Sequence, residues 1–140
     1  MTRTPADSGH IECITWNGEP LCYIVGRGLT PQKTTFLTPP ESPLQVGFVR
    51  RDAGEEIPRH THRPVERTIR TTSEVLFVQR GRCRLDLYSD DHEHVATREL
   101  REGDLVVIVG GGHGFQILED ITLLEIKQGP YVAAGDKERF

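Results

Sequence analysis

Two histidines and a glutamate have residue types and a spacing that suit the binding of a transition-metal ion. His60 and His62 are separated by one residue. In an extended strand, side chains two positions apart point to the same face, about 6.6–7 Å apart, and two such imidazoles can converge on one ion at bonds of about 2 Å. Glu74 shares its predicted strand face with Leu76 and Val78. We therefore expect its carboxylate to point into the core, where a cation would balance its charge.

A third histidine follows a flexible turn. His113 comes directly after three glycines, which themselves follow the apolar segment 105–109. Glycines allow the backbone to bend sharply, so this turn can direct the imidazole inward. Three imidazoles and one carboxylate suit Mn, Fe(II), Co, Ni or Zn, and an octahedral ion would keep two positions open for water or a substrate. The sequence therefore predicts one divalent transition-metal ion, with the ligands His60, His62, Glu74 and His113.

The segments that must position these ligands have the length and composition of β-strands. Glycine and proline together make up 23 of 140 residues, and they separate short apolar stretches. The predicted strands are residues 21–25, 44–49, 74–78, 83–88, 105–109 and 121–127. Strands that recur without intervening helices indicate antiparallel pairing, and such a sheet protects its edges by closing into a barrel or a jelly roll. The pattern allows only a short helical turn, at residues 133–139.

Composition excludes several other classes of protein. The net charge is −4 and the charges are spread along the chain, so no basic surface for nucleic acid is expected. The longest apolar run has five residues, which is too short to span a membrane, and the N-terminus has no apolar core of a signal peptide. Three widely spaced cysteines favour buried or half-buried free thiols in a reducing compartment. We expect a cytoplasmic protein with one domain.

The ligand spacing resembles that of the cupin superfamily. The family's first motif is matched by Gly54-x5-His60-x-His62 and by Glu74-x6-Gly81, and its second motif is matched loosely by the residues from Gly103 to His113. The resemblance covers residues 44–127. It implies an all-β, cupin-type jelly-roll β-barrel that binds a metal through His60, His62, Glu74 and His113. It further implies a homodimer. The five prolines of the first 40 residues favour an N-terminal extension (1–43) of strands and loops on the outside of the barrel, and residues 128–140 are expected to form a C-terminal tail.

The gap between His62 and Glu74 departs from the family pattern. It holds eleven residues instead of three or four, so Glu66, after three intervening residues, is a rival ligand. Glu74 is preferred because it opens an apolar strand at the expected distance from Gly81.

Three arginines in this gap suggest a role in ligand binding. The segment could be a lid over the metal, in which one arginine holds a carboxylate or a phosphate in a bidentate contact, or it could be a solvated charged loop. The arginines are Arg63, Arg67 and Arg70. A second His-x-His pair, His92 and His94, follows turn residues and is interpreted as part of a solvated hairpin.

These features predict a small metal-dependent enzyme that acts on a small polar molecule. A sugar derivative or an organic acid would fit, in an isomerase, epimerase or oxygenase reaction, with the metal as Lewis acid or oxygen-activating centre. The competing hypothesis is a non-catalytic module that binds or senses a small molecule, with a structural metal or none. Glu66 and Tyr131 are candidates for acid–base chemistry by residue type alone, and no catalytic residue is assigned.

Overall fold

Antiparallel β-strands form all the regular structure of residues 10–140, which are the residues that the computed structural model describes. The strands are β1 (Ile11–Trp16), β2 (Glu19–Val25), β3 (Thr35–Phe36), β4 (Gly47–Phe48), β5 (Glu74–Tyr88), β6 (His94–Arg101), β7 (Leu105–Ile108) and β8 (Gly112–Lys127). The all-β prediction is confirmed, and the short helical turn that the pattern allowed at residues 133–139 is not formed. Nowhere in residues 10–140 is there a helix long and apolar enough to cross a membrane.

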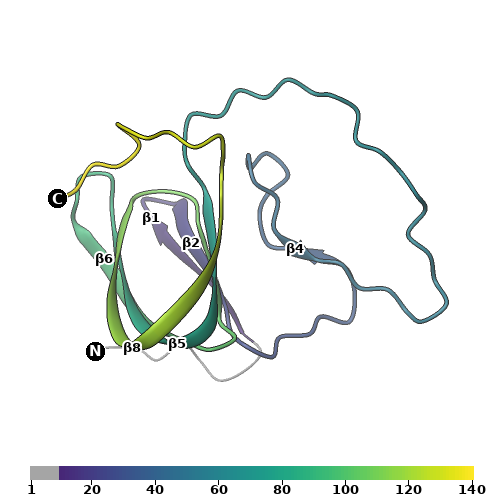
Figure 1. Cartoon of the computed structure of the whole chain (residues 1–140), viewed down its shortest axis with the longest axis horizontal. Coiled ribbons are helices and arrows are strands. Elements are labelled where there is room, and N and C mark those ends of the chain that lie inside the picture. The colour runs from purple at the N-terminus through teal and green to yellow at the C-terminus, as the bar shows by residue number, and fades with distance from the viewer. Residues whose placement is uncertain (1–9) are drawn as a thin grey trace.

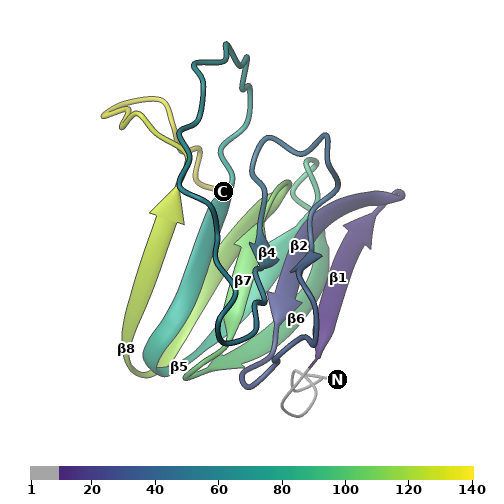
Figure 2. The ribbon, with the colours of Figure 1, turned by 90° about the vertical axis from the view of Figure 1, so that its right-hand side faces the viewer.

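Six of the strands form one curled sheet, which makes a half-barrel (Figure 1). The order along the main path is β1-β2-β7-β5-β6, and β8 pairs with β5. The first part of β5 pairs with β7, its second part pairs with β6, and β8 accompanies β5 along both parts. The strands β3 and β4 form a separate two-stranded hairpin. Figure 2 shows this hairpin in front of the sheet, with β8 and β1 at its two sides.

A glycine allows β5 to bend between its two parts. Gly81 has a φ of 91°, and a Cβ added there would lie 2.1 Å from the carbonyl oxygen of Asp120 in β8. Only glycine satisfies both the dihedral angle and the close approach. The pairing register between β5 and β8 also shifts around this position. Both strands therefore curve together, and the two ends of β5 come to the same rim of the half-barrel.

The main core fills the inside of the curl. It combines buried side chains of β1 and β2, such as Ile14 and Ile24, with those of the later strands, such as Leu85 and Val106. The first strands are thus part of the sheet, since β2 pairs directly with β7. They are not wrapped on its outside. The boundaries expected after residues 43 and 127 remain predictions.

A second, smaller cluster covers the outer face of the sheet. Tyr23, Val75 and Val107 are buried there against Leu37, Leu44 and Val46, which flank β3 and β4. The segment predicted as a strand at 44–49 is mostly irregular, with only Gly47 and Phe48 paired. Burial of apolar side chains, rather than strand pairing, therefore holds this part of the chain on the sheet.

Candidate functional site

Glu74 and His113 meet at the rim of the half-barrel. Glu74 is the first residue of β5 and is only 7% exposed. The Nε2 atom of His113 lies 3.2 Å from its Oε2 atom. These residues are 39 positions apart in the chain, and tertiary structure alone brings them into contact.

The local backbone explains this contact. Glu74 pairs with Ile108 at the end of β7, and only residues 109–111 separate that strand from β8. In this turn Gly111 has a φ of 64°, and a Cβ on it would lie 2.2 Å from the carbonyl oxygen of Tyr88. The glycine-rich turn predicted from the sequence therefore delivers His113 to the side of Glu74.

The charge of Glu74 is stabilised by its neighbours. The hydrogen bond from His113 is the largest effect and lowers the pKa of the Glu74 carboxyl below its usual value, although burial acts in the opposite direction. The charges of His113 and Lys127 and a side-chain contact with Glu125 lower it further. Glu74 is therefore ionised at neutral pH, as a metal ligand must be.

Lys127 and Glu125 are members of this site that the sequence reasoning did not identify. Lys127 lies opposite Glu74 across the β5–β8 pairing, and Glu125 lies opposite Leu76. Their period-two spacing at the end of the predicted strand 121–127 was the available signal, because it puts both side chains on one face.

His60 and His62 lie elsewhere, in the long segment 49–73 between β4 and β5. This segment has no regular secondary structure, and every residue from 51 to 68 is exposed. Figure 2 shows it extending far beyond the end of the sheet. The two imidazoles are close to each other, with ring centroids 5.3 Å apart. The Nδ1 atom of His60 is 2.7 Å from the carbonyl oxygen of Pro58, a contact that would leave Nε2 free to bind a metal if Nδ1 carries the proton.

The predicted ligands thus form two separate pairs in this structure. Within residues 10–140, no three His, Cys, Asp or Glu side chains are grouped closely enough to hold a metal ion. The rival ligand Glu66 is exposed in the same long segment as the His60–His62 pair. The second His-x-His pair is exposed at the β5–β6 turn: His92 stacks on Phe140, and His94 lies 3.8 Å from Asp86.

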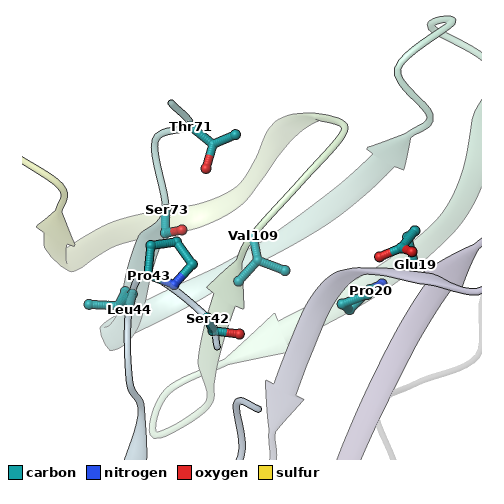
Figure 3. A pocket seen from close by; sticks show the side chains of 8 residues that line it. All are labelled: Glu19, Pro20, Ser42, Pro43, Leu44, Thr71, Ser73 and Val109. Carbon is teal, nitrogen blue, oxygen red and sulfur yellow. The ribbon is translucent and has the colours of Figure 1, made fainter. Parts of the chain in front are cut away.

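Two shallow pockets lie beside the rim, and neither is lined by a predicted ligand. One, of about 160 Å³, lies between Glu19 and Pro20 on one side and Thr71 and Ser73 on the other (Figure 3). The second, of about 210 Å³, is bordered by residues 69–72 and by the chain after β8, and Arg70 and Lys127 are among its lining residues. Arg70, one arginine of the predicted lid, therefore lies near the end of β8.

No family model matches the chain, and no curated protein and no solved structure is significantly similar to it. Its own geometry defines a class, which is an antiparallel all-β protein with a curled sheet and, at the rim, a buried glutamate in contact with an exposed histidine.

Proposed function

We propose that the protein is a small metal-binding cupin with a jelly-roll barrel. It would bind one divalent transition-metal ion through Glu74 and His113, together with His60 and His62. The observation that carries the proposal is the buried, ionised carboxylate of Glu74, which faces an imidazole at the mouth of an antiparallel barrel-like sheet. A carboxylate and imidazoles are the donors that such ions prefer, so the residues present fit the group.

The chain's own residues have distinct parts in this proposal. Glu74 is already deprotonated near neutral pH, so it can act as a ligand without releasing a proton. The contact of the His60 Nδ1 atom with the Pro58 carbonyl favours the tautomer whose Nε2 atom carries the lone pair. The bound ion would supply Lewis-acid or oxygen-activating chemistry.

The positive charges beside the rim favour an anionic or strongly polar small molecule as the substrate. Arg70 and Lys127 line the same pocket next to the end of β8. A guanidinium and an ammonium can hold a carboxylate or a phosphate group. A sugar derivative or an organic acid, converted in an isomerase, epimerase or oxygenase reaction, matches this chemistry. The cytoplasmic location and the absence of nucleic-acid and membrane partners remain expectations from composition.

A non-catalytic binding or sensing module is the second candidate. The observation in its favour is that the Glu74 carboxylate already has a partner in His113, so the pair is satisfied without a metal. In that case the rim would capture a small polar ligand, and the metal would be structural or absent.

Elemental analysis of protein purified without a metal-affinity tag separates the candidates. We expect about one equivalent of a transition metal in the wild type, and a loss of most of it in His60→Ala and in Glu74→Ala. His10→Ala and Glu102→Ala, two exposed positions outside the predicted site, are the matched controls and should retain the metal. Full retention in both ligand variants, or a metal-free wild type after growth with each candidate metal, would contradict the proposal.

A further inference from the structure

The strand β8 has one edge without a partner. It is 16 residues long and pairs with β5, and no strand within residues 10–140 pairs with its other edge. Several large apolar side chains along it are exposed, with exposed fractions of 38–57%: Ile117, Leu118, Leu124 and Ile126. A long apolar edge strand of this kind is a template for pairing with another segment of chain.

The segment 49–73 has unpaired backbone groups and exposed apolar side chains, which a free strand edge can accept. Residues 56–71 make no backbone-to-backbone hydrogen bond with any residue that the structure describes. Ile57 and Val65 are 57% and 60% exposed on it. An irregular segment with unpaired backbone groups and exposed apolar side chains gains stability when it adds to a sheet edge.

The charges of these two surfaces have opposite signs. Segment 49–73 carries six arginines and four acidic residues, a net charge of +2 with neutral histidines, whereas β8 carries three acidic residues and one lysine, a net charge of −2. Opposite charges favour the correct encounter of two such surfaces and disfavour the pairing of each with itself.

Within one molecule only the last residues of the segment reach β8: the N–H group of Gln128, directly after β8, donates to the carbonyl oxygen of Ser73, and residues 69–72 line a pocket with Lys127. The exposed part of the segment, residues 51–68, makes no backbone pairing with β8. The segment leaves the sheet from the side that carries the β3–β4 hairpin, whereas β8 lies at the edge of the sheet (Figures 1 and 2). Its first end is fixed by β4 and by Val46, which is packed in the outer cluster. In a dimer with a twofold axis, each copy can place its segment 49–73 on the free β8 edge of the other copy. Both segments and both edges are then occupied, so the assembly closes at a dimer.

We propose that segment 49–73 of each copy pairs with the free edge of β8 in a second copy, so that each metal site is shared. Glu74 and His113 of one chain would meet His60 and His62 of the other. The inference rests on the proposed function for the identity of the ligands. It explains why the four ligands fall into two separate pairs within one chain.

Complementation between two defective variants tests the shared site through metal content. One chain carries His60→Ala and His62→Ala, and the other carries Glu74→Ala and His113→Ala. Each alone should bind no metal. A refolded equimolar mixture should recover about a quarter of the wild-type content, because half of the dimers are mixed and each mixed dimer has one intact site. If the wild type binds metal but the mixture recovers none, the sharing is wrong while the proposed function stands.

The oligomeric state tests the exchange independently of any metal. We expect metal-free wild type to sediment as a dimer, and Val65→Asp to shift it toward monomer by at least tenfold in dissociation constant. Val132→Asp, at a similarly exposed valine outside the segment, is the matched control and should leave the dimer intact. A wild type that is monomeric at all concentrations, or a dimer that Val65→Asp leaves unchanged, would overturn the inference even if the metal proposal held.

Discussion

Arg98 of β6 binds Glu12 of β1 through two guanidinium nitrogens, although these strands lie at opposite ends of the five-strand path. The Nε atom of Arg98 lies 3.0 and 3.1 Å from the two carboxylate oxygens of Glu12. The Arg98 side chain is only 17% exposed. The contact joins the two ends of the sheet path, and it is possible only because the sheet curls.

We expect this ion pair to stabilise the curl measurably. Arg98→Lys cannot make the bidentate contact, and Glu12→Gln removes its charge, so each should lower the free energy of unfolding. A double-mutant cycle in urea should give a coupling energy of about 1–2 kcal/mol. The more exposed pair of Arg50 and Asp52 is the control and should couple by less than about 0.5 kcal/mol. Equal coupling in the two pairs would contradict the prediction.

Asp104 ties two turns together and should be among the most sensitive polar residues. Its carboxylate is 4% exposed and accepts hydrogen bonds from the backbone N–H groups of Arg27, at 2.9 Å, and Arg101, at 2.8 Å. Asp104→Ala leaves both donors without this acceptor, so we expect a loss of about 2–4 kcal/mol in the free energy of unfolding. Asp104→Asn should lose less, because one acceptor oxygen remains. A loss in Asp104→Ala no larger than that of Asp90→Ala, at an exposed hairpin position, would argue against this role.

Gly81 should tolerate alanine far less well than a glycine of similar backbone conformation in open space. Gly81→Ala combines a positive φ with a contact of 2.1 Å to the Asp120 carbonyl oxygen, whereas Gly18, with a φ of 79°, has no heavy atom within 4 Å of the added Cβ. Thermal unfolding should show a loss of about 1 kcal/mol for Gly18→Ala and at least about 3 kcal/mol for Gly81→Ala. Similar losses in the two variants would show that the bend of β5 does not depend on this close approach.

The buried thiol of Cys83 should make the protein sensitive to alkaline pH. Cys22 and Cys83 are fully buried, whereas Cys13 is exposed, contrary to the expectation of three buried or half-buried thiols. Burial raises the pKa of the Cys83 thiol from 9.0 to about 11. Above pH 9 the unfolded chain ionises this thiol while the folded chain keeps it neutral, so stability is lost between about pH 9 and pH 11.

Denaturant unfolding as a function of pH measures this loss. Cys83→Ala is less stable at neutral pH because of the lost packing, but its decline from pH 9 to pH 11 should be smaller than that of the wild type by roughly 2–3 kcal/mol. Cys13→Ala, at the exposed thiol, should change the decline much less. Parallel curves for the wild type and Cys83→Ala would refute the assignment.

The sequence alone determined the fold class and much of the strand content. Alternation of apolar and polar residues predicts Cys83, Leu85 and Leu87 as one buried face, and all three are fully buried. Three strands, β1, β3 and β6, were not predicted. β6 has the sequence HVATRELR, whose side chains are mostly half-buried, so it lacks the apolar pattern that marks the other strands. The predicted strands 74–78 and 83–88 are one continuous strand, because Gly81 bends β5 instead of ending it.

Tertiary structure decided which of the predicted ligands meet. Residue types and motif spacing select His60, His62, Glu74 and His113, since donor chemistry is a local property of the chain. Spacing along a chain does not fix distance in space when the intervening segment has no partner to pair with. The turn at residues 109–111 lies between paired strands and therefore sets the 3.2 Å contact of His113 with Glu74. The long segment that holds His60 and His62 has no such pairing within residues 10–140, so its position depends on contacts that the local sequence does not encode.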